Sequence, residues 1–171
     1  MEEQFQQPQV VQPPRVTYAG FWWRFLAYII DDLIISFVNF ILIAPVWAML
    51  GLSFFGLVRH EHYSYDESWL GFIGPFVGGI IYASVIATAA KWLYFSLMES
   101  SKYQATLGKM AIGIKVTDMN GNRISFARAT GRYFGKILSG MIIMIGYIMA
   151  GITEKKQALH DILAETLVIK V

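Results

Sequence analysis

The residues best suited to chemistry are two adjacent carboxylates, Asp31 and Asp32, inside a long apolar segment. An ionised Asp at the centre of a membrane helix costs roughly 2.5–3.5 kcal/mol, so such acids usually face a protein interior or an aqueous cavity. Two neighbouring carboxylates in a low dielectric do not both ionise easily. A carboxylate that holds either a proton or a monovalent cation is the minimum requirement for cation/proton exchange.

Other polar side chains share a helical face with these acids. At 100° per residue, six of them fall within an arc of about 140°: Arg24, Tyr28, Asp31, Asp32, Ser36 and Asn39. Arg24 is about 10 Å from Asp31 along the helix axis, so only a bridging group could link the two. A second apolar segment carries Ser84, Thr88 and Lys91 on one face. We predict that Lys91 approaches Asp31 or Asp32, and that Arg24 and Lys91 are the charge partners of the two acids.

The same charges allow two other interpretations. They could form a buried Arg–Asp–Lys network that only ties two helices together, or they could dock a partner protein. The sequence leaves all three interpretations open.

Composition indicates a membrane protein. Of the 171 residues, 56% are hydrophobic and 15% are charged, whereas soluble domains carry about 25% charged residues. This length accommodates one small domain and leaves no room for a separate soluble enzyme, so we expect no enzymatic activity. The absence of cysteine excludes disulfides and thiolate metal sites, and the net charge of +2 gives no indication of nucleic-acid binding.

Two segments are predicted to cross the bilayer. Residues 33–58 carry no charge over 26 residues, about 39 Å of helix against a hydrocarbon core of roughly 30 Å. We expect this helix to begin near Gly20. Residues 68–90 form a second charge-free run of 23 residues, and Pro45 and Pro75 should kink the two helices.

The third apolar run, residues 137–153, is only 17 residues long, at the lower limit for a span. Just before it, Arg128, Arg132 and Lys136 recur every four residues and so share one helical face. This spacing predicts an amphipathic helix in the headgroup plane. The run that follows would be a short third span, or part of a re-entrant hairpin of residues 125–153.

The distribution of basic residues predicts the orientation. Residues 99–136 contain seven Lys or Arg against two acids, whereas residues 59–67 contain one Arg against three acids. The positive-inside rule therefore places the amino terminus of this multi-pass cell-membrane protein in the cytoplasm. Alternating residues around Ile114 and Ile169 predict two short strands. Their pairing would favour a cytoplasmic carboxyl end, although a third span would place it outside.

The flanking and loop segments give weaker signals. Residues 1–16 are rich in Gln and Pro and are predicted to be a disordered tail, followed by one membrane domain over residues 17–171. His60-Glu61-His62, with Asp66 and Glu67, could hold a divalent ion, but such clusters are common in solvated loops. We therefore predict no metal site and no cofactor. Asn120-Gly121 indicates a turn that leads to Ser125, a plausible helix N-cap.

Several short motifs occur in a familiar order. They are Ala19-Gly20-Phe21-Trp22-Trp23-Arg24 with Asp31 seven residues after the Arg, Thr106-Leu107-Gly108-Lys109, Gly113-Ile114-Lys115-Val116, and Gln157-Ala158-Leu159-His160-Asp161. Each motif alone is weak. Together, over residues 19–171, the chain resembles the RDD family of small prokaryotic membrane proteins.

The resemblance implies roles for particular residues. The family is named for one Arg and two Asp, which the resemblance assigns to Arg24, Asp31 and Asp161. Some members are described as Na⁺(Li⁺, K⁺)/H⁺ antiporters, and most are described only as transport-related. The neighbouring His160 could relay protons with Asp161, but a tertiary anchor is the simpler interpretation.

These observations predict an all-α helical membrane protein with two full spans, an interfacial amphipathic helix, a short third span or re-entrant hairpin, and a small cytoplasmic β-hairpin. The predicted function is transport-related, with monovalent cation/proton exchange (Na⁺ or K⁺ against H⁺) at Asp31 and Asp32. The alternative is a non-catalytic regulatory or adaptor subunit that binds another membrane protein. One copy encloses few helices, so transport would require a homo-oligomer in the lipid bilayer.

Overall fold

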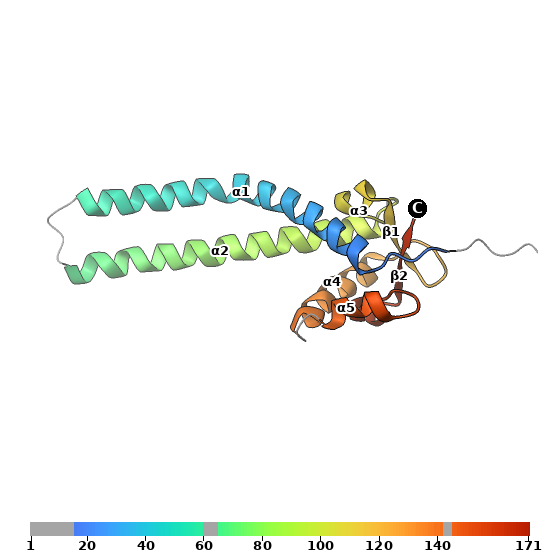
Figure 1. The fold of residues 1–171 in the computed structure, drawn as a ribbon. Helices are drawn as coiled ribbons and strands as arrows, with labels where there is room; N and C mark the ends of the chain where they lie inside the picture. The colour runs from blue at the N-terminus through green and yellow to red at the C-terminus, as the bar shows by residue number, and fades with distance from the viewer. Residues whose placement is uncertain (1–15, 60–64, 142–144) are drawn as a thin grey trace, which may run out of the picture.

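The computed structural model describes residues 16–59, 65–141 and 145–171. Two long helices, α1 (Phe21–Arg59) and α2 (Tyr65–Ser100), lie side by side and extend from a small head (Figure 1). The head comprises six short elements: α3 (Leu107–Ala111), β1 (Ile114–Asp118), α4 (Phe126–Met141), α5 (Ile145–Ile152), α6 (Leu159–Leu163) and β2 (Thr166–Lys170). The predicted tail over residues 1–16 and the cluster His60-Glu61-His62 lie outside the described residues, apart from Val16.

The two long helices are the two predicted spans. Their candidate membrane segments are Phe21–Gly56 and Ile73–Ser100, whose most apolar 18-residue windows have mean hydropathies of 2.3 and 1.7. The prediction of two spans is therefore confirmed, and α1 begins one residue after Gly20 as expected. Because 36 residues of helix extend about 54 Å, α1 must tilt, bend or reach into the headgroup layers. Pro45 and Pro75 lie inside α1 and α2.

The third apolar run does not form one straight span. Helices α4 and α5 meet at an angle of 97°. Strands β1 and β2 pair antiparallel, with Ile114 opposite Lys170 and Asp118 opposite Thr166, which confirms the predicted strand pairing. Because paired strands lie on the same side of a membrane, the chain between them cannot cross it once. The re-entrant alternative agrees with this pairing, and a single third span does not.

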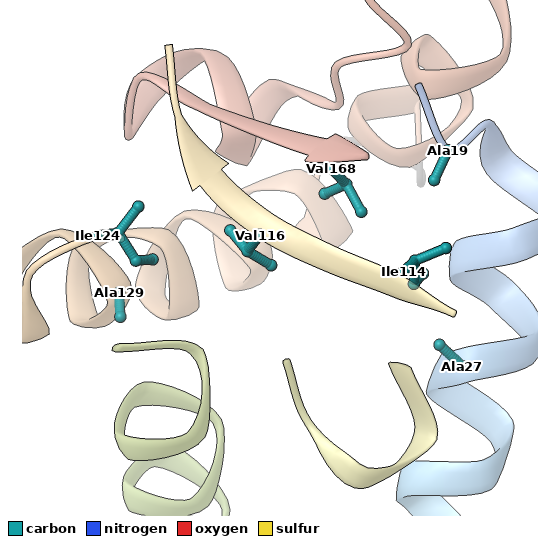
Figure 2. Close-up of a cluster of buried hydrophobic side chains, with 7 residues drawn as sticks. All are labelled: Ala19, Ala27, Ile114, Val116, Ile124, Ala129 and Val168. Atoms are coloured by element: carbon teal, nitrogen blue, oxygen red, sulfur yellow. The ribbon is translucent and has the colours of Figure 1, made fainter. Parts of the chain in front are cut away.

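Small side chains allow the head to close tightly around the two strands. The core consists of Ala19, Ala27, Ile114, Val116, Ile124, Ala129 and Val168 (Figure 2). Alternate residues of β1 point into this core. The segment before α1 is bound to β2, because the Ala19 N–H donates to the Val168 carbonyl at 2.8 Å. The start of the first span is thus fixed to a strand near the other end of the sequence.

Helix α4 has the predicted division into a cationic and an apolar face, and the middle cation of the three is buried inside the head. Arg132 is only 2% exposed, because its guanidinium is drawn to carboxylates inside the head. The outward face is apolar, with Phe134, Ile137, Leu138 and Met141 all exposed. The amphipathic character predicted for this helix is therefore confirmed, and its apolar face is the one available to lipid.

The start of α4 follows the predicted local signals. Gly121 has a φ of +85°, a conformation that glycine adopts without strain. The Ser125 hydroxyl accepts a hydrogen bond from the Arg128 N–H at 3.2 Å. Ser125 therefore caps the helix as predicted.

Gly108 marks the closest approach of α3 to α1, and it provides a test of this packing. A Cβ at position 108 would lie 2.3 Å from the Ala27 carbonyl oxygen and 2.9 Å from the Asp31 Cγ. We expect Gly108→Ala to lower the free energy of unfolding by roughly 1–3 kcal/mol, because α3 must move away from α1. Thermal unfolding of the purified protein in detergent measures the change.

The matched control is Gly131→Ala in α4, where an added Cβ meets no atom within 4 Å. This change should leave the protein as stable or slightly more stable, because Ala favours helix interiors. Equal losses in the two variants would contradict the proposed packing.

Candidate functional site

Asp31 is completely buried and binds the start of α3. Its Oδ2 accepts a hydrogen bond from the Thr106 hydroxyl at 2.5 Å, and its Oδ1 accepts one from the Gly108 N–H at 2.8 Å. The Tyr94 hydroxyl of α2 also donates to Oδ1, at 2.8 Å. Three donors from two elements therefore hold this carboxylate, and Asp31 anchors α1 to both α2 and α3.

Asp32 has a different environment from its neighbour. The Lys91 Nζ lies 2.8 Å from the Asp32 Oδ1, and the two side chains are 32% and 43% exposed, respectively. The Lys91 ammonium also lies 5.5 Å from the centre of the Tyr28 ring. The prediction that Lys91 approaches one of the two acids is confirmed for Asp32. Among the ion pairs of the described residues, Asp31 has no cationic partner.

The Asp32–Lys91 pair belongs to a longer row of polar side chains, which we refer to as the polar seam. Its members are exposed or half-buried and lie at membrane depth on the two long helices: Tyr28, Asp32, Ser36 and Asn39 on α1, and Ser84, Thr88 and Lys91 on α2. Within each helix they recur at intervals of three or four residues, so each set follows one face. The seam is therefore a polar surface within otherwise apolar spans.

Arg24 does not contact either acid of the first span. Its guanidinium forms an ion pair with Asp161 of α6. Its Nε donates to the Ala19 carbonyl at 2.8 Å, and its Nη2 donates to the Lys156 carbonyl at 2.6 Å. The prediction that Arg24 is a charge partner of Asp31 and Asp32 is wrong, because α6 brings a closer carboxylate to it.

Asp161 is the centre of a larger ion-pair network. Besides Arg24 it binds Arg132, whose Nε lies 2.7 Å from Oδ1. Arg132 also binds Glu99, with its Nη1 at 2.6 Å from Oε2. Glu99 in turn pairs with Lys109, and the Lys136 Nζ lies 3.5 Å from Oε1. These six residues, the ion-pair network, join α1, α2, α3, α4 and α6.

Burial and charge shift the pKa values of the groups at the head end. Although burial alone would raise the pKa of Asp161, Arg132 and Arg24 hold it well below its usual range. Burial lowers the pKa of Lys109 to about 7, against the opposing effect of Glu99. Burial likewise lowers the pKa of His160 to about 3, so its ring is neutral at neutral pH.

His160 is held by packing. Its Nδ1 lies 3.3 Å from the Ser139 hydroxyl, and its ring centre lies 5.2 Å from that of Tyr147. A Cβ added at Gly135 would lie 3.1 Å from the Cβ of His160. This close packing favours the anchor interpretation over a proton relay.

Comparison with known proteins identifies the family. The model of the RDD family matches residues 18–165. The chain belongs to the RDD family. It is similar to two proteins of Bacillus subtilis (strain 168). The uncharacterized protein YxaI is 38% identical over 151 residues, which cover 88% of this chain and 96% of the relative. The uncharacterized membrane protein YteJ is 30% identical over 169 residues, which cover 95% and 87%. No solved structure matches significantly.

The three residues that the resemblance assigns to the family's name all make contacts within the head or with it. Arg24 and Asp161 are ion-paired directly. Asp31, which lies two helical turns after Arg24 on α1, binds α3. Asp31 and Asp161 are fully buried and the Arg24 side chain is 13% exposed, so all three lie within the fold.

The sequence did not predict several members of the ion-pair network and of the group that binds Asp31. Glu99 had one available signal, since it ends the apolar run of α2 and precedes a strongly basic connection. Thr106 and Gly108 were recognised only as part of a motif, without a role. Among the residues that the structure describes, no group of three His, Asp or Glu side chains could hold a metal ion.

Removing the charge of Asp161 should strongly destabilise the RDD protein. In Asp161→Asn, two guanidinium groups lose a buried counter-ion, and breaking a buried pair costs roughly 3–5 kcal/mol. Thermal or denaturant unfolding in detergent measures the loss. The control is Glu165→Gln, whose carboxylate is 72% exposed and 3.5 Å from Arg128, and whose loss should not exceed about 1 kcal/mol. Similar losses in both variants would refute the central role of Asp161.

The buried, neutral His160 predicts a pH dependence of stability. The pKa of its ring is about 3 in the folded protein and about 6.5 when unfolded. Between these values the unfolded chain binds the additional proton, so stability falls as pH falls, by up to about 1.4 kcal/mol per pH unit. Unfolding measured from pH 6.5 to 5 should show this slope. A His160→Gln variant with the same slope would exclude His160 as its source.

Proposed function

We propose that this RDD protein is a non-enzymatic membrane subunit that binds another membrane protein through its polar seam. The observation that supports this function is the exposure of the seam at membrane depth. In the most apolar window of each candidate span, only 6% of the residues are buried within the single chain. Most side chains in these windows are therefore exposed or half-buried and can contact lipid or other proteins.

Lipid is an unfavourable neighbour for this surface. Hydrocarbon offers no hydrogen-bond partners, and a charged side chain at the centre of a membrane helix costs roughly 2.5–3.5 kcal/mol. Asp32 and Lys91 offset part of this cost by pairing, but each remains partly exposed. A helix of another protein with Ser, Thr, Asn or Gln facing the seam would supply the missing hydrogen bonds.

Monovalent cation/proton exchange is a second candidate, supported by the exposed carboxylate of Asp32. Protonation of Asp32 would release Lys91, and Na⁺ or K⁺ could compete for the same oxygens. Asp31 is less suitable, because three donors already occupy its carboxylate. We rank this function second because Asp32 lies on the outer surface of the helix pair, so a pathway would need further copies of the chain.

We also propose that the head and the amino terminus face the cytoplasm. The excess of basic residues between positions 99 and 136 supports this orientation.

Site-specific photo-crosslinking in cells tests the docking function. A photo-reactive residue in place of Thr88 lies in the seam, and one in place of Ile86 lies on another face of α2. Both native side chains are exposed. We expect a discrete protein adduct from position 88 and none from position 86. Equal adducts at the two positions, or none at either, would contradict docking through the seam.

Proteoliposomes separate the two candidate functions. With a preset pH gradient, we expect the purified protein to show no proton movement on addition of Na⁺ or K⁺, because one chain offers no enclosed pathway. Cation-dependent proton movement that is lost in Asp32→Asn but kept in Glu154→Gln would favour exchange over docking. Glu154 is the matched control because it is an exposed acid outside the spans.

A further inference from the structure

A groove with a volume of about 550 Å³ lies between the first turn of α1 and helix α5. Phe21 and Trp22 contribute from α1, and Ile148, Gly151 and Ile152 contribute from α5. Lys156, in the loop after α5, also lines it. The groove thus combines apolar walls with one ammonium group.

The apolar walls are open to the surroundings of the protein. Trp22 is 75% exposed, Ile148 49% and Ile152 79%. In water such exposure would be unfavourable, whereas tryptophan is enriched where hydrocarbon meets the headgroups. Helix α4 of the head also has an exposed apolar face. The groove therefore has the character of a surface in contact with lipid at headgroup depth.

The charges around the groove are positive. The Lys156 ammonium donates to the Gly151 carbonyl at 3.0 Å, which holds it beside the groove. The Lys170 ammonium lies 4.2 Å from the ring centre of Trp23, another lining residue. Among the described residues that line the groove, none is acidic. A ligand with a negative head and an apolar body would complement this surface.

We propose that this groove binds an anionic phospholipid. The phosphate oxygens accept from the Lys156 ammonium, with Lys170 adding favourable charge, and the acyl chains lie against Trp22 and Ile152. A free phosphate ion would make no use of the apolar walls, and a zwitterionic lipid would make less use of the two ammonium groups. The groove shares no lining residue with the polar seam, so this site can be tested separately from partner docking.

Native mass spectrometry of the detergent-solubilised full chain tests the proposal. The protein is titrated with phosphatidylglycerol and with phosphatidylcholine of identical acyl chains. We expect phosphatidylglycerol to bind about fivefold more tightly, the effect of one basic residue near an anionic headgroup. Lys156→Gln should remove this preference. Lys155→Gln, which changes a neighbouring exposed lysine outside the groove, should retain it.

A second variant tests the apolar part of the site. A leucine side chain in Gly151→Leu would occupy the groove and should weaken binding of both lipids. Equal affinity of the wild type for the two lipids, or equal effects of the Lys156 and Lys155 variants, would overturn the proposal. Displacement of phosphatidylglycerol by millimolar inorganic phosphate would also overturn it, because the site would then recognise a free anion.

Discussion

The buried carboxylate of Asp161, held between the guanidinium groups of Arg24 and Arg132, is the interaction on which the head depends. Each of these charges would be costly inside the protein without the others. Arg132 extends the pairing to Glu99 of α2, while Arg24 connects Asp161 with α1. Loss of one charge would leave its buried partners with fewer counter-ions, so the helices of the head are stabilised together.

The head has charged groups inside and apolar groups outside, which suits a protein at the surface of a bilayer. Arg132 of α4 is buried while Phe134 and Ile137 on the same helix are exposed. In a soluble protein this arrangement would expose apolar surface at a considerable cost. In a membrane the same apolar surface contacts lipid, and every buried polar group must find its partner within the protein. The ion-pair network and the bonds to Asp31 meet this requirement for the buried charged groups, whereas the buried Ser96 hydroxyl has no hydrogen-bond partner among the described residues.

The spans, the strands and the helix cap are predicted correctly because each depends on residues that are close together in the sequence. Charge-free length predicts the spans, alternation predicts the two strands, and Ser125 follows a local capping rule. Equal depth in two helices predicts that Lys91 approaches Asp31 or Asp32, and the structure pairs it with Asp32. The partner of Arg24 was beyond this reasoning, because helical periodicity shows which face a side chain occupies and not which distant segment packs there.

Two sets of contacts, those of Arg132 in α4 and those of Asp31, are not predicted from the sequence, for related physical reasons. An amphipathic pattern defines two faces of a helix, but burial of the charged face of α4 depends on carboxylates supplied by α2 and α6. One of the donors to Asp31 is the backbone N–H of Gly108. Almost every residue has such a donor, so the type of side chain does not predict which N–H will bind Asp31. Only the absence of a side chain at position 108 hints at the close contact.

The sequence distance between Arg24 and Asp161 has a consequence for biosynthesis. The two residues are 137 positions apart, and β2, which holds the segment before α1, is later still. During translation, α1 therefore reaches the membrane while its arginine still lacks the carboxylate that will neutralise it. The newly made first helix must keep Arg24 hydrated near the bilayer surface until α6 emerges from the ribosome. The head can close only at the end of synthesis, so a chain that stops before position 161 carries an unpaired cation at the start of its first span.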